Sequence, residues 1–144
     1  MAQTSVVDAT KAQAETVIRW LKDEHLNELE GLSGFYFNRS IIRSAAQYSE
    51  MKCLLLGRKI IGFAVFASMT INIFEIRPNA RGQGFGRHFA TNIINMLFDR
   101  GAPEINVECS PRSSEPFWRG LGFVEKEDMY QSWGSNPKLV LRKP

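Results

Sequence analysis

The segment Glu75–Arg87 constrains the fold of this chain more than any other. It begins at the end of an apolar run, Ile71–Ile76, whose strand character stops at Pro78, and it leads into a helix expected over Gly84–Arg100. Glycines let a backbone approach a ligand closely, and a helix N-terminus presents unpaired N–H groups at the positive end of its dipole. A strand, a glycine-rich turn and a helix in this order indicate an anion-binding site, typically for phosphate.

Three arginines, Arg77, Arg81 and Arg87, add positive charge to this segment, and no acidic residue occurs between positions 76 and 98. A pyrophosphate is the anion that such a turn suits best, although a plain tight turn between strand and helix is the alternative interpretation. The segment is not a P-loop, because Arg87 and His88 follow Gly86 where lysine and a hydroxyl residue are required. Its glycine spacing also differs from the dinucleotide-binding pattern.

Hydrophobic periodicity in the rest of the chain predicts a mixed α/β domain around one sheet. Thr10 and Gln13 have the spacing of a capping box, so a first helix is expected from Lys11 into the late twenties. Asn38 is placed to cap a second helix. The later elements expected are strands at Met51–Leu56, Ile60–Ala67 and Ile105–Cys109, a short helix capped by Ser113 or Ser114, and weak strands near Phe123–Glu127 and Leu139–Arg142.

Length and composition argue against several classes of protein. The chain has 144 residues, which suit one domain over residues 1–144, and its formal charge of +3 is too small and too local to indicate a nucleic-acid binder. No apolar stretch is long enough for a membrane span and no signal peptide is recognisable, so we expect a cytoplasmic protein without a membrane partner. Cys53 and Cys109 are expected to be buried free thiols, and no metal site is expected.

The glycine turn resembles the R/Q-x-x-G-x-G/A motif of the GNAT superfamily of acetyl-CoA-dependent N-acetyltransferases, matched here by Arg81, Gly84 and Gly86. A second segment, Phe117–Phe123, is similar to the aromatic-aromatic-x-x-Leu-Gly-Phe signature of that family. The resemblance covers roughly residues 51–123 and implies an α/β (α+β) fold with a mixed central sheet of about six strands, about four helices and splayed central strands. A clear first strand is missing, because Val6–Val7 is its only candidate.

The same resemblance implies that acetyl-CoA is the acyl donor. It places the CoA pyrophosphate on the turn residues Arg81, Gly82, Gln83, Gly84, Phe85, Gly86 and Arg87. Strand residues from Phe74 to Ile76 would bind the pantetheine arm through their backbone, and a diverging neighbour strand, Val107–Ser110, would leave a wedge for the thioester. The remaining residues expected at the cofactor are Ser113, Phe117 and Trp118.

Acetyl transfer to an amine requires removal of a proton, and Glu75 is the carboxylate best placed at that wedge. An ion pair between Glu75 and Arg77 is the alternative, and Glu108 on the neighbouring strand is the second candidate base. Trp118 stands where the family usually has a tyrosine that protonates the leaving thiolate, and an indole cannot act as that acid. Either water or a hydroxyl group would serve instead, or no acid is needed; the hydroxyl candidates are Ser110, Ser113 and Tyr36.

Phe35 and Tyr36 follow the first helix, in a loop that the resemblance places beside the acceptor wedge. They would line an amine pocket, or else form a hydrophobic plug that anchors the helices. We therefore predict an N-acetyltransferase in which a primary amine of a small molecule, a protein lysine or an N-terminus attacks acetyl-CoA directly, without an acyl-enzyme. The alternative is a non-catalytic acyl-CoA-binding module, and whether the protein forms a homodimer is left open.

Overall fold

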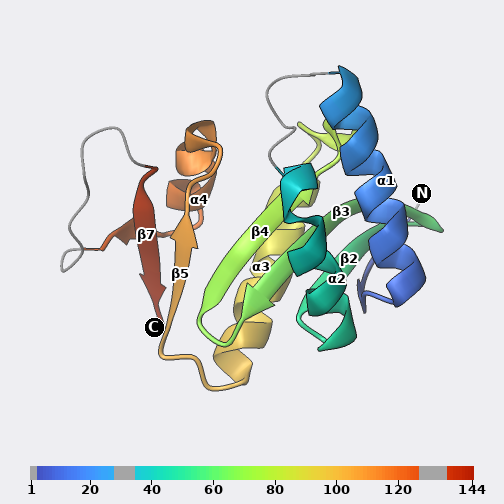
Figure 1. Cartoon of the computed structure of the whole chain (residues 1–144). Helices are drawn as coiled ribbons and strands as arrows, with labels where there is room; N and C mark the ends of the chain where they lie inside the picture. Colours follow the sequence, from blue (N-terminus) through green and yellow to red (C-terminus); the bar gives the residue numbers. More distant parts are fainter. Residues whose placement is uncertain (1–2, 28–34, 127–135) are drawn as a thin grey trace.

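Figure 1 shows the computed structural model, which describes residues 3–27, 35–126 and 136–144. Within these residues, seven strands form one mixed sheet in the order β1-β2-β3-β4-β5-β7-β6. Along the chain the strands and helices are β1 (Thr4–Asp8), α1 (Lys11–Asn27), α2 (Arg39–Gln47), β2 (Met51–Leu56), β3 (Lys59–Ala67), β4 (Thr70–Ile76), α3 (Phe85–Asp99), β5 (Glu104–Glu108), α4 (Glu115–Gly120), β6 (Val124–Glu125) and β7 (Lys138–Arg142). None of these helices combines the length and apolar character that a membrane span requires.

A first strand exists, and it contains Val6–Val7, the only candidate that the sequence offers. β1 pairs antiparallel with β2 from Thr4 opposite Leu56 to Asp8 opposite Lys52. The Lys52 Nζ atom donates a 2.8 Å hydrogen bond to Asp8 Oδ1 at the end of this ladder. The segment offers only two consecutive apolar residues, so its strand state depends on pairing with a distant part of the chain rather than on its own pattern. With β1 and the two-residue β6, the sheet has seven strands instead of about six.

The two N-terminal helices begin in different ways. The capping box ahead of α1 is confirmed, because the Thr10 N–H donates to Gln13 Oε1 over 2.9 Å and the Gln13 N–H donates to Thr10 Oγ1 over 3.1 Å. Asn38 stands at the N-cap of α2 but makes no side-chain cap hydrogen bond, so that prediction is wrong. Its backbone has φ −93° and ψ 14°, which continues a preceding helical turn rather than the extended conformation of a capping residue.

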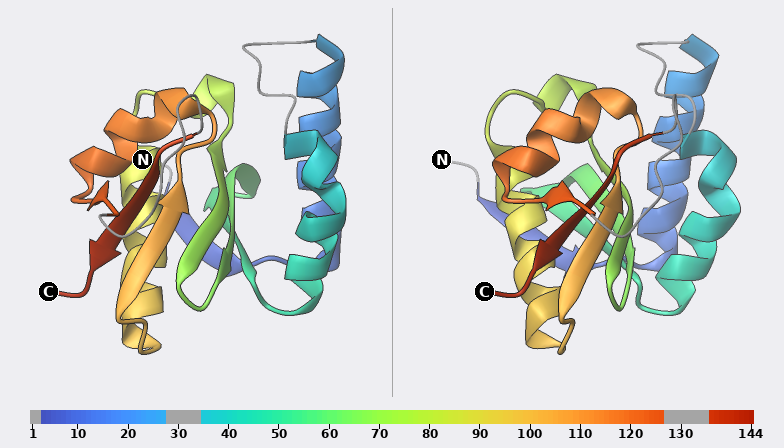
Figure 2. Two further views of the ribbon diagram at one scale, coloured as in Figure 1. Left: turned by 60° about the vertical axis from the view of Figure 1, so that its left-hand side comes forward. Right: turned by 90° about the vertical axis from the view of Figure 1, so that its left-hand side faces the viewer.

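The helices form two layers, one on each face of the sheet. Figure 2 shows α1 and α2 together on one face and α3 on the other. Val17, Leu21 and Ile42 are fully buried against the first face. The apolar stripe of α3 is buried against the second face, where Phe89 and Ile93 have no exposed surface. Burial of these two helix stripes fixes the sheet between them.

The central strands β4 and β5 are parallel but stay together for only two residue pairs, Thr70 with Asn106 and Ile71 with Val107. At this end the backbone N–H and the side-chain Nδ2 of Asn106 both donate to the Met69 carbonyl oxygen, over 2.8 and 3.1 Å. Beyond it, β4 pairs only with β3 and β5 only with β7 in the described part of the chain. The expected splay of the central strands is therefore present, and it opens toward the end of β4 that carries Glu75.

Candidate active site

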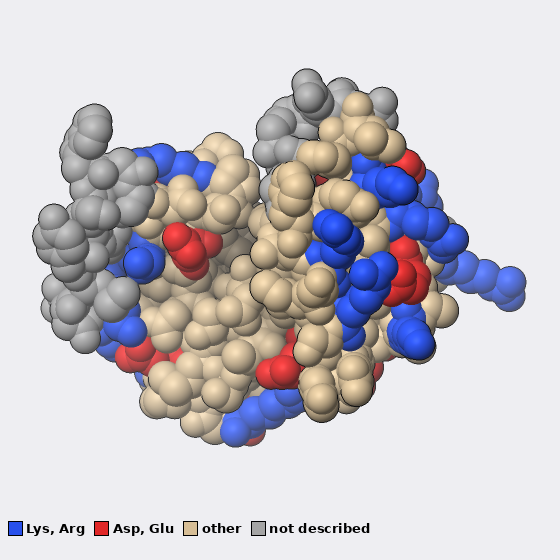
Figure 3. Space-filling view, in the orientation of Figure 1, with Lys and Arg blue, Asp and Glu red and all other residues tan. Residues whose placement is uncertain are grey.

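A cleft of about 610 Å³ occupies the space where β4 and β5 diverge. The molecular face drawn in Figure 3 is hollowed between the part that carries α4 and β5 and the part that carries α1 and α2. The lining residues come from the turn before α2, the end of β4, the glycine turn, the start of α3, the segment that leads into α4, and α4 itself. They are Phe35, Phe74, Glu75, Ile76, Arg81, Gly82, Gly84, Gly86, Arg87, Pro111, Ser113, Ser114 and Phe117.

The glycine turn connects β4 to α3 at the floor of this cleft. A single 3₁₀ turn over Pro78–Ala80 follows the strand, and then Gly82 and Gly84 adopt φ values of +76° and +85°. These left-handed conformations are strained for other residues, which explains glycine at both positions. The backbone N–H of His88 donates to the Gly84 carbonyl oxygen over 3.2 Å, so the N–H groups of residues 85–87 precede the helical ladder and remain for an anion.

Gly86 lies in the first turn of α3 and faces Phe117 of α4. A Cβ atom on Gly86 would lie 3.2 Å from Phe117 Cε1 and 3.6 Å from Ile76 Cγ1. The Nη1 atom of Arg87 donates to the Gly120 carbonyl oxygen over 3.3 Å, which ties the same turn of α3 to the end of α4. The absence of a side chain at position 86 thus keeps the cleft open beside the helix N-terminus.

Glu75 lies in the wall of the cleft, although only 4% of it is exposed. Its Oε1 atom lies 3.4 Å from Arg81 Nη2, and Arg81 Nε donates to the Ile76 carbonyl oxygen over 2.9 Å. The ion pair of Glu75 is thus with Arg81 rather than with Arg77, whose guanidinium lies 4.9 Å from the ring centroid of Trp20. Burial and the nearby charge of Glu24 raise the pKa of Glu75 to about 8, against the opposing effect of Arg81 and Arg77.

Glu108 and Ser110, the other predicted catalytic residues, are exposed and do not line the cleft. Their neighbours Val107 and Cys109 are buried, and successive side chains of a strand point to opposite faces. The ladder of β5 with β7, in which Glu108 is opposite Lys138, sets this alternation. The structure therefore does not bring Glu108 or Ser110 together with Glu75.

The predicted cofactor residues divide into those that line the cleft and those that support its wall. Phe74 and Phe117 line it and stack with ring centroids 5.6 Å apart. Trp118 is 5% exposed and packs edge-on against Phe74, Phe117 and Phe123 at 5.0–5.4 Å, behind the lining. Gln83 and Phe85 also fall outside the lining.

The two serines before α4 line the cleft, but neither caps the helix through its side chain. Ser114 occupies the N-cap position of α4, and its Oγ atom instead donates to the Pro111 carbonyl oxygen over 2.7 Å. The prediction of a serine cap is therefore wrong for Ser114, because its hydroxyl closes the preceding turn. Ser113 lines the same cleft.

The structure separates the two predicted acceptor residues. Phe35 lines the cleft, whereas Tyr36 stacks on His25 of α1 with ring centroids 5.4 Å apart. The guanidinium of Arg39 lies 4.6 Å from the centroid of the same tyrosine ring. Tyr36 therefore behaves as the anchor between helices, and of these two residues only Phe35 lines the cleft that Glu75 also lines.

Comparison with known proteins decides the family. A family model described as the acetyltransferase (GNAT) domain matches residues 21–136, which is most of the chain. The chain belongs to the GNAT acetyltransferase family. Its class is therefore that of the acetyl-CoA-dependent N-acetyltransferases, as the two sequence motifs predicted. No curated protein sequence matches this GNAT chain significantly.

Solved structures share the GNAT fold with this chain at low sequence identity. The PaiA N-acetyltransferase from Thermoplasma acidophilum, in complex with coenzyme A, superposes with a TM-score of 0.76 at 11% identity over 98% of this chain and 99% of its own. N-acetylglutamate synthase from Neisseria gonorrhoeae, complexed with coenzyme A and N-acetyl-glutamate, gives 0.73 at 17% identity, over 99% of this chain and 35% of the synthase. Ard1 from Thermoplasma volcanium gives 0.72 at 14% identity over 96% and 97%.

Sequence reasoning missed Glu24 of α1 in this GNAT domain. Glu24 is only 6% exposed, and the Nε1 atom of Trp20 donates a 2.8 Å hydrogen bond to its Oε1 atom. The sequence did hold a signal, because the buried stripe of α1 passes through Val17 and Leu21 and reaches Glu24 three residues later. Glutamate is rarely buried without a polar or charged partner, so its place in an apolar stripe marks it as a candidate functional residue.

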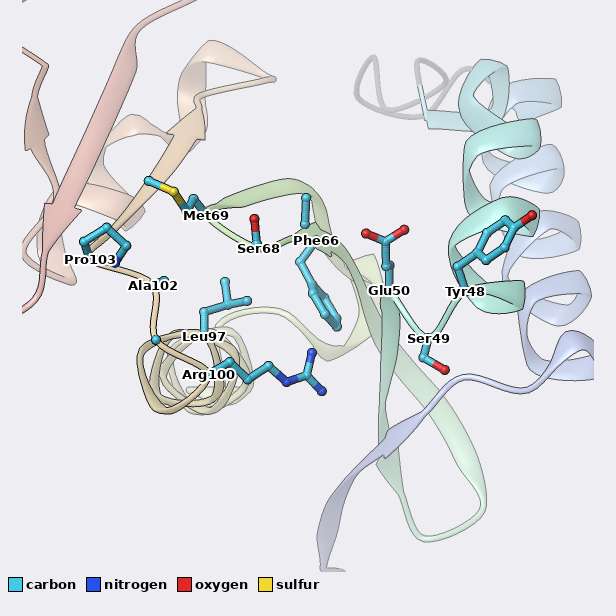
Figure 4. Close-up of a pocket in the computed structure, with 12 residues that line it drawn as sticks. Tyr48, Ser49, Glu50, Phe66, Ser68, Met69, Leu97, Arg100, Ala102 and Pro103 are labelled. Carbon is cyan, nitrogen blue, oxygen red and sulfur yellow. The ribbon is translucent and has the colours of Figure 1, made fainter.

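A second cavity, of about 710 Å³, lies at the other end of β3 and β4 (Figure 4). Tyr48 and Glu50 stand on one side of it, and Leu97 and Arg100 on the other. The Arg100 guanidinium lies 5.8 Å from the ring centroid of Phe66. This cavity has neither a glycine turn nor a helix N-terminus, so we assign it no part in acetyl transfer.

Proposed function

We propose that this protein transfers the acetyl group of acetyl-CoA to a primary amine by direct attack of the amine on the thioester. The observation that carries the proposal is the position of Glu75, a buried carboxyl group in the wall of the same cleft as the glycine turn. The proposed anion site and the proposed base would thus share one cavity, which is the arrangement that transfer from CoA to an amine requires.

The donor half of the cleft suits CoA. The backbone N–H groups at the start of α3, with the cations Arg81 and Arg87, would hold the pyrophosphate. Phe74 and Phe117 would supply an apolar wall for the pantetheine arm, and beyond Ile71 no strand of the described residues pairs with the edge of β4 that faces the cleft. Oriented donors on that edge would polarise the acetyl carbonyl group.

Glu75 would take a proton from the acceptor ammonium group, which leaves a neutral amine to attack the carbonyl carbon. A C–N bond forms, the C–S bond breaks, CoA leaves as its thiolate, and the nitrogen loses a second proton, which balances the proton that the thiolate gains. Cys109 is fully buried and burial raises the pKa of its thiol, so it is a poor acyl carrier and supports direct attack. A proton for the thiolate would come from water or from Ser113, the hydroxyl candidate that lines the cleft.

The acceptor would enter past Phe35, which lines the cleft opposite the donor half. An aromatic side chain near a carboxyl group suits an amine with an apolar or flexible stem, but it does not distinguish a free amine from a lysine or an N-terminus. Arg81 and Arg87 would bind the donor, so Glu75 would have to balance the positive charge of the acceptor ammonium group.

The deciding experiment is CoA release from acetyl-CoA, measured with a polyamine, an amino acid, an amine antibiotic, a lysine peptide and a peptide with a free N-terminus. We expect release with one acceptor class, and a fall in kcat/KM of roughly 10²-fold or more in Glu75→Gln with little change in acetyl-CoA affinity. Glu108→Gln, which removes the exposed candidate, should keep the rate. Tight acetyl-CoA binding with no release for any amine would favour the non-catalytic acyl-CoA-binding module.

A further inference from the structure

We propose that Glu24 of α1 is a positioning residue of the acetyl-transfer site, which strengthens Glu75 as a base through one proton shared between the two carboxyl groups. The inference rests on the proposed role of Glu75. It adds a second carboxyl group from a different element, outside the glycine-turn motif and outside the cleft lining.

Burial of the two carboxyl groups is the first observation. Glu24 and Glu75 are the only charged residues among the described ones that are buried to this degree, with 6% and 4% exposed. Each uses its Oε1 atom in a known contact, Glu24 with the Trp20 indole N–H at 2.8 Å and Glu75 with Arg81 at 3.4 Å. The Oε2 atom of each is buried and receives no hydrogen bond from a donor in the described residues.

A proton shared by Glu24 and Glu75 would lower the electrostatic cost of burying both carboxyl groups. Two buried carboxylates side by side, each with an unpaired oxygen, are costly, because both desolvation and like-charge repulsion oppose ionisation. The nearby charge of Glu24 raises the pKa of Glu75, and a hydrogen bond between the two carboxyl groups would need one of them to carry a proton. The pair then bears a single negative charge, spread over both residues.

The aromatic and charged groups near the two carboxyl groups come from α1, β3, the end of β4 and the glycine turn. Trp20 of α1 donates to Glu24, and its ring packs edge-on against Phe63 of β3, which is opposite Glu75 in the β3–β4 ladder. Arg81 of the glycine turn contacts Glu75, and Arg77 after β4 lies against Trp20. These two cations lower the pKa of Glu75, but burial and Glu24 outweigh them and raise it to about 8.

The pair matters for catalysis because a stronger base holds a transferred proton better. When both carboxyl groups are ionised, an ammonium group at the cleft gives one proton to Glu75, and the proton is then shared with Glu24 while the neutral amine attacks. An isolated glutamate, with its pKa of about 4.5, would return the proton to the amine far more readily. Release of the shared proton to water restores the ionised pair.

The test uses Glu24→Gln, which keeps the side-chain size and the Oε1 acceptor for Trp20. Carboxyl ¹³C NMR titration of the full-length protein, without any acceptor, should place the Glu75 transition near pH 8 in the wild type and at clearly lower pH in Glu24→Gln. Glu15→Gln, which removes an exposed carboxylate of the same helix, should leave the transition unmoved. A Glu75 transition at the same pH in Glu24→Gln and wild type overturns the inference.

Trp20→Phe gives a second variant with the opposite expected sign. Loss of the indole donor disfavours the ionised Glu24, so the pair should keep its proton to higher pH and the Glu75 transition should rise. A lower or unchanged transition in folded Trp20→Phe overturns the shared-proton account. The Trp20→Phe variant also tests the inference if Glu24→Gln does not fold.

Kinetics separates this inference from the proposed function. In Glu24→Gln the ascending limb of kcat/KM against pH should move to lower pH, because Glu75 loses its proton at lower pH. The alkaline plateau should fall, because Glu75 is then a weaker base. A purely structural role would lower the whole profile and leave the limb in place, which overturns the inference alone. An unchanged rate in Glu75→Gln overturns the proposed function, whatever the NMR titration shows.

Discussion

Arg81 Nη2 lies 3.4 Å from Glu75 Oε1, so a residue of the glycine-turn motif touches the base that we propose for the reaction. The same guanidinium donates to the Ile76 carbonyl oxygen at the end of β4. On the proposed mechanism, this one side chain would therefore couple donor binding to proton removal.

Arg81→Gln should change both functions at once. Loss of the cation raises the pKa of Glu75 further, because Arg81 is the largest influence that lowers it. The ascending limb of kcat/KM should therefore move to higher pH, and the dissociation constant for CoA should increase. Calorimetric titration with CoA and a pH–rate profile measure the two effects, and a change in CoA affinity without any shift of the limb would contradict the coupling.

Two glycine substitutions should separate strain from loss of the anion site. Gly84→Ala places a side chain at φ +85° beside the helix N-terminus, and Gly57→Ala places one at φ +63° in the β2–β3 turn, with open space around both. Each should cost on the order of 1–2 kcal/mol of stability in thermal or chemical unfolding. Only Gly84→Ala should weaken CoA binding, so equal CoA affinities in the two variants would argue against the turn as the pyrophosphate site.

Glu75 should make the protein less stable as pH rises through the neutral range. The folded state keeps this proton up to a pKa of about 8, whereas the unfolded chain loses it near 4.5. Between these values the folded state binds more protons, so the free energy of unfolding falls with increasing pH by up to about 1.4 kcal/mol per unit. Urea unfolding from pH 5 to 9 should show this slope in the wild type and a flatter dependence in Glu75→Gln. Parallel curves would mean that Glu75 titrates normally.

Trp118 should act through packing alone. It is 5% exposed and lies behind Phe74 and Phe117, so Trp118→Phe should retain most of the turnover and weaken acetyl-CoA binding only modestly. Trp118→Ala should lose about 3–5 kcal/mol of stability because it empties a buried aromatic site. Steady-state transfer and thermal melts measure both. A stable Trp118→Phe protein that binds acetyl-CoA but does not turn over would show that the indole N–H takes part in the reaction.

Much of the fold follows from local sequence pattern. The capping box at Thr10, the α3 stripe through Phe89 and the hairpin around Gly57 depend on residues a few positions apart, so periodicity and turn chemistry predict them. β1 has only the weak signal of Val6–Val7, because its strand state comes from its pairing with β2, which lies far along the chain. The cap at Asn38 failed because the preceding turn is already helical.

In the candidate site, too, local sequence pattern predicts some features and long-range pairing determines the others. Glu75 and the glycine turn are contiguous in sequence, so their common cleft could be anticipated. The outward direction of Glu108 depends on the register of β5 with β7, which no local pattern encodes. Glu24 lies on α1 and Glu75 on β4, so the influence of one acid on the pKa of the other arises only in the folded chain.

The short ladder between β4 and β5 also determines where the molecule can open. Four strands on one side and three on the other form continuous ladders, and within the described residues only the pairs at Thr70 and Ile71 connect them. Local opening favours the segment with the fewest backbone bonds, so amide exchange at this seam can proceed while both outer ladders stay intact. A donor molecule lying along the free edge of β4 would bridge the two halves, and its occupancy would then set how cooperatively the whole sheet unfolds.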